Sequence, residues 1–276
     1  HQLTRKGRAR ILFLDRQNIT QNMIGNLTRT KEIGPYHADI QGDATNGGVR
    51  GPFKIVEVKK GKVPTYPSLW SHDAVRERTM AFDASEEAVS RVPKNADEKT
   101  VIDRKVTEVW STASHLHFNQ NFQFNSQSTA VQYSPRLSLG GRAWIAINLG
   151  NAEAEKIGCV WGNCSLGLLV HWYWANKQQS GRGNIGKNQL ATLPFLDVSA
   201  LTPTQVTAGV KVFDDMLALD LQPLHDLATD ANRHELDRRF LTECLGFDPA
   251  IVAPGGPLDL LRQKLAAEPS IRGGKA

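Results

Sequence analysis

The chain has 276 residues, of which 40% are hydrophobic and 22% are charged, and its formal net charge is +5 at pH 7. This composition is that of an ordinary globular protein, and it excludes intrinsically disordered and collagen-like chains. The mild excess of basic residues leans toward polyanionic partners, but it is too small to identify one.

Three cysteines, Cys159, Cys164 and Cys244, form no CxxC pair and leave one residue over. This pattern argues against a disulfide framework and predicts buried thiols and a cytoplasmic location. The chain begins with His1, so it can be a piece of a longer polypeptide, and its first residues lack the apolar core of a secretory signal.

Residues 1–150 are predicted to form a strand-rich lobe. Between residues 9 and 133 the apolar residues occur in short or alternating runs, as in ARILFLD, PFKIVEV and NFQFNSQSTAVQY, which predict strands. Two segments, HDAVRERTMAFDASEEAVSRV and DEKTVIDRKVTEVWSTAS, combine acidic starts with spaced apolar residues and predict short helices. LGGRAWIAINL predicts one more strand. The expected fold class is therefore α+β.

Residues 151–247 are predicted to be helical. The apolar stretch 157–175 approaches the length of a membrane span, about 20 residues. Asn163, Ser165 and His171 lie inside it, so we expect one central buried helix of a protein that does not enter a membrane. TPTQVTAGVKVFDDMLAL and DANRHELDRRFLTECLGF both open on a capping residue and predict further helices. Residues 248–276 are a Pro- and Gly-rich tail, which we expect to pack loosely.

The polar segment KQQSGRGNIGKNQ follows the apolar stretch. Its cations and amides are typical of contacts to phosphates and base edges, and its glycines allow close approach to a backbone. The alternative is an ordinary polar loop leaving a buried helix. The candidate DNA-binding residues of this segment are Lys177, Gln178, Gln179, Arg182, Asn184 and Lys187.

The segment HFNQNFQFNSQ interleaves phenylalanines with amides, so a strand would bury the rings and present the amides on its other face. Asn119, Asn121 and Gln123 are candidates for pairing with adenine edges, and the alternative is that these amides bond to nearby loops. Arg136 and Arg142 are expected to assist the DNA contacts.

Sequence signatures of catalysis do not occur in the chain: there is no GxSxG, P-loop, HExxH or GxGxxG after a strand. His115 and His117 alternate as strand neighbours do, and with His72 or Asp73 they could share a metal. Two such histidines do not make a site, so we predict no metal and no catalytic residue. A metal-dependent hydrolase stays an alternative.

Five segments in order carry a resemblance to a known family. YPSLWSHDAVRERTM, WSTASHLHFNQNFQFNSQSTAVQYSPRLSLGGRAW, VWGNCSLGLLVHWYWANKQQSGRG, LATLPFLDVSALTPTQ and RHELDRRFLTECLGF resemble the carboxy-terminal target recognition region of bacterial N6-adenine DNA methyltransferase proteins. These proteins belong to restriction-modification and phage-defence systems, and their recognition regions are similar to type I specificity subunits. In that pattern a hydrophobic Asn-Ser-x-Leu helix precedes a Leu-x-x-Leu-Pro segment. Here residues 163–166 match the helix motif, with Cys164 interrupting it, and residues 190–194 match the second.

The resemblance implies double-stranded DNA as a partner, together with a methyltransferase domain or subunit. The family's glycine-rich cofactor motif and its Asn-Pro-Pro-Tyr tetrapeptide do not occur in this sequence. We therefore expect a recognition part that is not itself an enzyme, with S-adenosylmethionine bound only in a missing catalytic part. An alternative is a scaffold subunit of a defence complex that docks a protein partner through the apolar helix.

Overall fold

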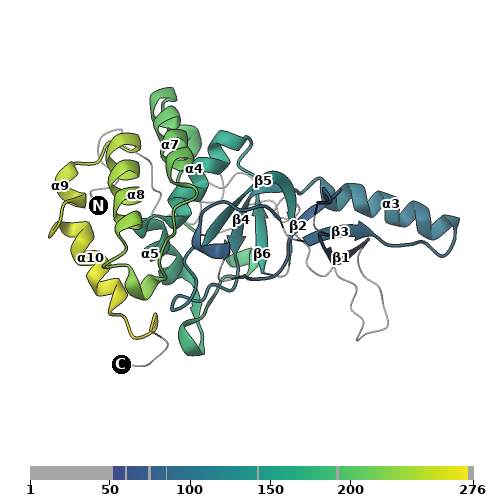
Figure 1. Cartoon of the computed structure of the whole chain (residues 1–276), viewed down its shortest axis with the longest axis horizontal. Coiled ribbons are helices and arrows are strands. Elements are labelled where there is room, and N and C mark those ends of the chain that lie inside the picture. Colours follow the sequence, from purple (N-terminus) through teal and green to yellow (C-terminus); the bar gives the residue numbers. More distant parts are fainter. Residues whose placement is uncertain are drawn as a thin grey trace.

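A central sheet separates two groups of helices in the computed structural model, which describes residues 52–59, 61–73, 76–84, 86–141, 143–190 and 193–272. Helix α3 extends from one end of the molecule, and α8, α9 and α10 lie at the opposite end (Figure 1). The observed class is α+β, as predicted. The strand expected at residues 9–15 lies outside the described residues.

The sheet has six strands and mixed connections. All neighbouring strands pair antiparallel except β2 and β5, which are parallel. In spatial order the strands are β1 (Phe53–Glu57), β3 (Glu86–Ser90), β2 (Pro67–Leu69), β5 (Val131–Gly140), β4 (Ser114–Asn119) and β6 (Trp144–Ile147). The predicted strands at PFKIVEV and at the end of LGGRAWIAINL are therefore present as β1 and β6.

Of the two helices expected in the strand-rich lobe, one is confirmed and one is wrong. Helix α3 (Ala96–Trp110) begins where the Asn95 side chain accepts a hydrogen bond from the Glu98 N–H at 2.8 Å. The segment 72–92 instead contains a short 3-10 turn, η3 (Arg76–Arg78), and strand β3. Strand β3 pairs with β1 on one side and β2 on the other, so tertiary contacts within the sheet decide the conformation of this segment.

The phenylalanine- and amide-rich segment is not one long strand. Strand β4 ends at Asn119, β5 begins at Val131, and the residues between them form turns and irregular backbone. The expected burial of the rings is correct, because Phe118, Phe122 and Phe124 are all buried. Phe118 reaches the core from β4 and the other two rings from a folded turn, so strand alternation does not decide where the amides after Asn119 point.

The long apolar stretch forms two helices, α4 (Ala152–Asn163) and α5 (Ser165–Trp174), and not the single helix predicted. Cys164 is extended, with ψ 160°, and its Sγ accepts a hydrogen bond from the Gly167 N–H at 3.4 Å, so it ends one helix and caps the next. Most of both helices is buried inside the chain, which does not favour docking of a partner through them. No helix in the described ranges has the length and apolar character of a membrane span.

The carboxy-terminal part contains the predicted capped helices. Helix α7 (Pro203–Met216) opens with a reciprocal capping box between Thr202 and Gln205, and α8 (Ala231–Arg239) is capped by Asp230. A π-helical turn, η7 (Phe240–Cys244), extends α8. The short segments between α5 and α8 are β7 (Asn176–Lys177), η4 (Gln179–Gly181), β8 (Gly183–Asn184), α6 (Lys187–Leu190), η5 (Val198–Ala200) and η6 (Leu224–Asp226).

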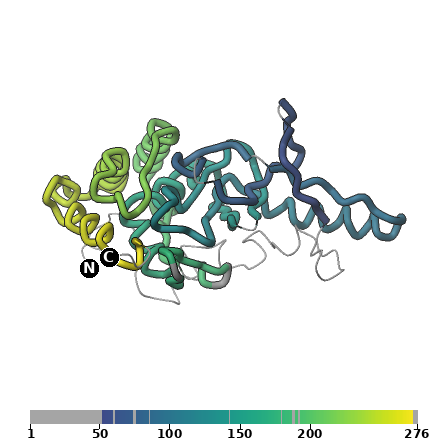
Figure 2. The backbone as a smooth tube through the Cα atoms, turned by 60° about the horizontal axis from the view of Figure 1, so that its bottom comes forward, coloured from purple at the N-terminus to yellow at the C-terminus, as the bar shows by residue number. Residues whose placement is uncertain are grey.

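The tail is packed, contrary to the loose packing expected from its prolines and glycines. It forms α9 (Pro249–Val252) and α10 (Pro257–Ala266), and both prolines lie at the helix starts, where no backbone N–H is needed. Leu258, Leu265 and Ile271 are buried against the main core. Figure 2 shows these last helices lying against the body. The expected divisions at residues 150 and 247 stay predictions.

Candidate nucleic-acid interface

The polar loop after α5 has a defined shape. Strands β7 and β8 pair antiparallel, and the Gln178 N–H donates to the Arg182 carbonyl at 2.7 Å, which closes the loop. At its tip Ser180 and Gly181 adopt positive φ values of 61° and 73°. The left-handed region is one that glycine enters without penalty, so Gly181 permits a tight reversal at the tip of the loop.

The loop is bonded through its backbone to the turn that follows β4. The Phe124 N–H donates to the Gly181 carbonyl at 2.9 Å, and the Gly183 N–H donates to the Phe122 carbonyl at 2.8 Å. A third bond joins the Ile185 N–H to the Gln120 carbonyl at 2.9 Å. Two polar segments predicted separately from the sequence therefore lie side by side. We call residues 120–127 and 176–186 together the paired-loop surface.

Three of the predicted contact residues are exposed on this surface: Lys177, Gln178 and Arg182. No ion pair or side-chain hydrogen bond of the Arg182 guanidinium involves another described residue. No described residue therefore neutralises its charge or uses its donors. An unpaired guanidinium can contact two acceptors at once on phosphate or on guanine.

Two further predicted residues are half-buried and bonded to each other across the two segments. The Asn184 side chain donates to Asn121 Oδ1 at 2.5 Å, and it also approaches the Gln120 carbonyl at 3.4 Å. These amides serve partly to hold the segments together, as the alternative interpretation of the sequence allowed. Gln123 is also half-buried, and its Oε1 accepts a hydrogen bond from Ser126 Oγ at 3.3 Å.

Asn119 does not belong to the surface, which corrects its prediction as a base contact. Its side chain is completely buried, donating to Gln127 Oε1 at 3.3 Å and accepting from the Asn121 N–H at 2.9 Å. Because β4 ends at this residue and the chain turns, the amide points into the turn and holds it. Gln127 is buried too, and its amide donates to Glu77 at 2.8 Å.

Arg136 lies on β5 and is already paired. Its Nε and Nη2 donate to the two carboxylate oxygens of Asp83 at 3.0 and 2.6 Å, so its charge is neutralised locally. This bidentate pair weakens its predicted role in phosphate binding. Arg142 and the side chains of Gln179 and Lys187 lie outside the described residues.

Lys177 is held against the end of α5. Its Nζ donates to the Tyr173 carbonyl at 3.0 Å and lies 4.7 Å from the centre of the Trp172 ring. Desolvation by this packing lowers the pKa of the Lys177 ammonium, and nearby Glu268 opposes the shift. The ammonium is therefore fixed in place beside an aromatic surface, a feature that residue composition alone did not indicate.

The support beneath the paired-loop surface is aromatic. His171 on α5 is buried among Phe118, Phe122 and Phe124, at ring-centre distances of 4.7, 5.2 and 5.6 Å. Burial lowers the pKa of His171 to about 3, so the ring is neutral. This packing ties the turn to α5 and gives the exposed groups a rigid base.

The helix motif of the resemblance has a structural role in this chain. Asn163 Oδ1 accepts from the Ala130 N–H at 2.8 Å, and its Nδ2 donates to the Val131 carbonyl at 2.7 Å, which fixes α4 to the start of β5. The Ser165 N–H donates to the buried Asp237 carboxylate at 2.8 Å. Leu190 and Leu193 of the second motif are buried.

The histidines proposed for a metal site each have another partner. His72 Nδ1 lies 3.2 Å from Glu77 Oε1, His115 Nδ1 lies 2.8 Å from the Ser134 carbonyl, and buried His117 lies 3.2 Å from the Ser138 carbonyl. Within the described ranges no three His, Cys, Asp or Glu side chains come together as metal ligands.

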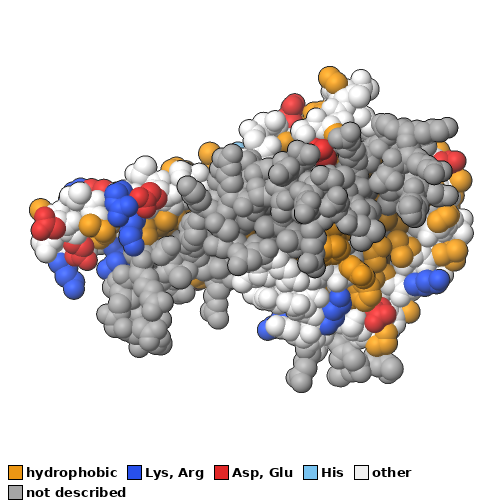
Figure 3. Space-filling view, turned by 180° about the vertical axis from the view of Figure 1, so that it is seen from behind, with side chains coloured by type: hydrophobic (Ala, Val, Ile, Leu, Met, Phe, Trp, Pro, Cys, Tyr) orange, Lys and Arg blue, Asp and Glu red, His pale blue; other side chains and the backbone are white. Residues whose placement is uncertain are grey.

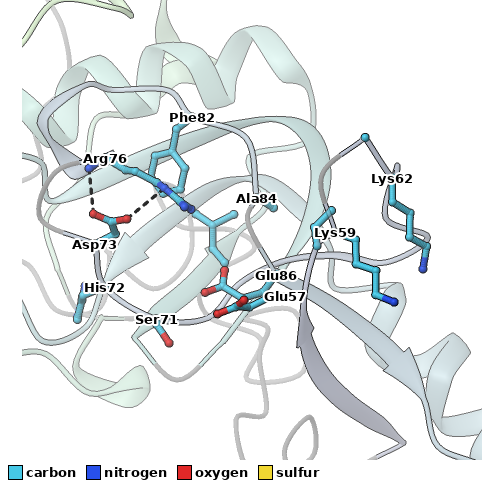
Figure 4. Close-up of a pocket in the computed structure, with 13 residues that line it drawn as sticks. Glu57, Lys59, Lys62, Ser71, His72, Asp73, Arg76, Phe82, Ala84 and Glu86 are labelled. Carbon is cyan, nitrogen blue, oxygen red and sulfur yellow. Dashed lines mark hydrogen bonds and ion pairs between the residues drawn. The ribbon is translucent and has the colours of Figure 1, made fainter.

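A separate cleft of about 730 Å³ lies between the β1 end of the sheet and η3 (Figure 4). Its charges are mixed and mostly paired: Arg76 Nε lies 3.1 Å from Asp73, while Lys62 contacts Glu87 at 3.1 Å. Glu57 and Glu86 face each other across the strands. This balance of charge gives the cleft no preference for an anion.

The described cations are scattered over the face shown in Figure 3, where hydrophobic side chains gather toward the end that carries the carboxy-terminal helices. The case for the paired-loop surface therefore depends on which groups it exposes, and not on a broad basic patch. Tyr173, which sequence reasoning missed, is 69% exposed at the end of α5. The signal for it was the run of three aromatic residues, Trp172 to Trp174, because a helix cannot turn three successive side chains inward.

No family model matches the chain, and no curated protein matches it. Among solved structures, the fold is similar to that of the type IIG restriction endonuclease BpuSI, with a TM-score of 0.50 and 10% sequence identity. The match covers 78% of this chain and 30% of that chain. At this identity the likeness concerns the fold, and this chain spans less than a third of the endonuclease.

Proposed function

We propose that the chain is the DNA-recognition part of a restriction-modification or phage-defence protein and that the paired-loop surface contacts double-stranded DNA. The observation that carries the proposal is the pairing of two polar segments, distant in the sequence, which places the exposed side chains of Lys177, Gln178 and Arg182 on one surface. The likeness of fold to part of a restriction endonuclease supports the same class of protein. In this proposal the chain reads DNA without transferring a methyl group, and a separate part binds S-adenosylmethionine.

The contacts of each exposed side chain on the paired-loop surface indicate its role in DNA binding. Arg182 has a free guanidinium and can donate two parallel hydrogen bonds to a guanine or a phosphate. Lys177 is fixed by Tyr173 and Trp172, so it supplies a positioned charge. Gln178 is exposed and can act as both donor and acceptor toward a base edge.

The first test is the salt dependence of binding. Fluorescence anisotropy of a labelled random-sequence duplex, titrated at low and moderate salt, should show binding that weakens steeply as salt rises, because phosphate contacts release counterions. Duplexes selected from a random pool would then identify the preferred sequence. Absence of any binding at low salt would contradict the proposal for this chain.

Arg182→Ala tests the role of the free guanidinium. We expect a loss of affinity for the selected duplex of about 5- to 150-fold, which corresponds to about 1–3 kcal/mol for one bidentate contact. Arg238→Ala is the matched control, because Arg238 is an exposed arginine on α8 that is paired with Glu235 and Glu243. Equal affinity of the wild type and the Arg182 variant would remove this residue from the interface.

A further inference from the structure

The last turn of α5 exposes an aromatic ring beside the loop. Tyr173 is 69% exposed. The other large hydrophobic side chains that are exposed in the described part of the chain are aliphatic. Burying a ring of this size would contribute about 2 kcal/mol of stability. Because the ring is exposed, the fold does not gain this stabilisation. A role in binding would account for the exposed ring.

The neighbours of Tyr173 are fixed in place. Trp172 is half-buried, and its Nε1 donates to Ser270 Oγ at 3.0 Å. The Trp174 ring lies 5.6 Å from the Tyr173 ring, and the Lys177 ammonium lies 6.0 Å from it. The end of α5 therefore presents an exposed ring with a positioned cation over one of its faces, and the amides of the loop follow directly in the chain.

The chemistry of a partner can be inferred from this combination. In a duplex the bases are stacked on one another, so a protein meets their edges and the phosphates but not their faces. An unpaired base exposes its face, and stacking on an aromatic side chain contributes about 1–3 kcal/mol per base. A nearby ammonium and amides then supply contacts to the phosphate and the base edge.

A protein partner fits this surface less well. A stable protein interface buries about 800 Å² on each partner around an apolar centre. Here the strongly exposed apolar surface is one ring, flanked by two half-buried tryptophans and followed by the exposed polar residues Asn176, Lys177 and Gln178. The charge and the amides match nucleic acid better than the apolar centre of a protein interface.

We propose that Tyr173, with Lys177 over one face of its ring, is a stacking site on its other face for an unpaired nucleobase of DNA bound along the paired-loop surface. The inference rests on the proposed function, since it assigns one more contact to the same DNA. It adds a ligand feature that the polar residues do not supply, namely recognition of a base outside the double helix.

Two substitutions separate stacking from simple apolar contact. Tyr173→Leu keeps an apolar side chain but removes the ring, and Tyr173→Phe keeps the ring but removes the hydroxyl. Each variant is titrated by anisotropy against a fully paired duplex and against the same duplex with one unpaired central nucleotide. Thermal unfolding followed by circular dichroism verifies that both variants fold, as expected for an exposed position.

The wild type and Tyr173→Phe should bind the duplex with the unpaired nucleotide about 5- to 150-fold more tightly than the paired one. Tyr173→Leu should lose that preference and keep its affinity for the paired duplex. Salt-dependent binding of the paired duplex without any preference, or a preference that survives in Tyr173→Leu, would overturn the inference alone. Absence of binding to either duplex would overturn the proposed function as well.

Discussion

Arg233 is completely buried and donates five hydrogen bonds to other groups of the protein. Its guanidinium donates to the carbonyls of Ser128 and Gln222 at 2.7 and 2.8 Å and to the Asp230 carboxylate at 3.1 Å, and it also donates to the Asn163 carbonyl. The fifth contact is its backbone N–H on Asp230 Oδ1. Burying a charge without such partners is prohibitively costly, so this arginine organises the fold and is not exposed to a binding partner.

Arg262 has a similar role beneath α5. Its Nη2 donates to Asp237 Oδ2 at 2.7 Å, and the same carboxylate receives the Ser165 hydroxyl. Both partners are buried, so the pair joins α10, α8 and the start of α5. Arginines in a mildly basic sequence therefore divide into buried structural ones and exposed ones such as Arg182, a division that net charge does not reveal.

His171 and His117 are the buried histidines whose protonation the fold opposes most clearly. The His171 ring nitrogens have no hydrogen-bond partner in the described structure, and the Phe rings around it cannot stabilise a charge by hydrogen bonding. Burial lowers the pKa of His117 to about 4, although the Ser138 carbonyl partly opposes the shift. Both rings are therefore neutral in the folded protein near neutral pH.

These shifts predict acid sensitivity of stability. The unfolded histidines bind protons near pH 6.5, while the folded ones do so near pH 4 and pH 3. The stabilisation is therefore present above about pH 6.5 and is lost as the pH falls toward 4. Between pH 7 and 5 each histidine should account for about 2 kcal/mol of lost unfolding free energy. Urea unfolding across this range measures it.

His171→Phe isolates one contribution. The variant keeps an aromatic ring among the three phenylalanines but has no group that binds a proton. Between pH 7 and 5 the unfolding free energy of the variant should therefore fall by about 2 kcal/mol less than that of the wild type. Above pH 7 the two proteins should show the same dependence on pH. Parallel curves throughout the acid range would show that His171 is accessible to protons in the folded state.

The exposure of three candidate contact residues was predictable from the sequence, whereas the burial of Asn119 was not. Lys177, Gln178 and Arg182 stand in a polar, glycine-containing run, and such runs lie on surfaces. For Asn119 the prediction depended on strand alternation continuing past residue 119. The chain turns there because Gln120 and Phe122 bond to the loop after α5, a contact between segments more than fifty residues apart.

At the scale of elements, the interruption of the apolar stretch at Cys164 decides the position of the loop. A continuous helix from residue 152 to 174 would direct residues 175–186 elsewhere. Instead the chain turns at Cys164, and Gly167 allows α5 to pass close to the Trp161 carbonyl, which would lie 1.9 Å from an added Cβ. Apolar periodicity could not predict this break, because both helices are apolar on most of their surface.

Strand β3 shows why a pattern of spaced apolar residues can mislead. Its sequence, EEAVS, carries two acidic residues that suggest the first turn of a helix. In the fold Glu87 is buried and accepts hydrogen bonds from the Thr65 N–H at 2.9 Å and from Lys62 at 3.1 Å. The backbone bond from Thr65 is the largest cause that lowers the pKa of Glu87. The partner that stabilises the strand is thus distant in the sequence.

The reversal at Gly181 gives a prediction for the loop as an element. Gly181→Ala places a Cβ at positive φ, where it would lie 2.7 Å from the Ile271 carbonyl. We expect a loss of about 1–2 kcal/mol of unfolding free energy from the backbone alone, with displacement of the loop and loss of DNA affinity. Urea unfolding and anisotropy measure the two effects.

Gly186→Ala is the control in the same loop, since an added Cβ there meets no atom within 4 Å. Its stability and DNA affinity should equal those of the wild type. If Gly181→Ala behaved like Gly186→Ala, the reversal would not be needed for binding.

At the scale of the whole molecule, two hydrophobic clusters share one strand. Val131 and Tyr133 of β5 belong to the main core with α4, α5 and α7, while Leu139 at its other end packs with α3. The second cluster is smaller and includes Ile102, Val106 and Val109 of α3. The end of the molecule that carries α3 therefore depends on its own set of apolar contacts.

Ile102→Ala tests whether this end opens separately. The truncation should cost about 2–4 kcal/mol locally. Hydrogen exchange should then accelerate in α3, β1 and β3 and stay unchanged in α4 and α5, as expected for a local opening. Val101→Ala, at a neighbouring position that is 46% exposed, is the control and should change nothing. Acceleration throughout the chain would show one cooperative unit.

The fold class and the polar character of the paired-loop surface followed from composition and local pattern. The order of strands in the sheet could not, because β3 lies between β1 and β2, and β2 pairs in parallel with a strand more than sixty residues away. Such long-range pairing depends on packing that no local signal encodes. The loose packing predicted for residues 248–276 was wrong for the same reason, because the tail is held by contacts with residues distant in the sequence.

Under the proposed function, the contact between the tail and the loop affects how the DNA sequence that is read could be altered. The Ile271 carbonyl lies under Gly181, and Ser270 holds Trp172, so the shape of the loop depends on residues about ninety positions later. A loop transferred to a related protein without the tail would lack the contacts that fix its shape. Exchange of DNA specificity between related proteins should therefore succeed when the loop and the tail are transferred together. In a library selected for a new DNA target, substitutions in the loop and in the tail should occur together.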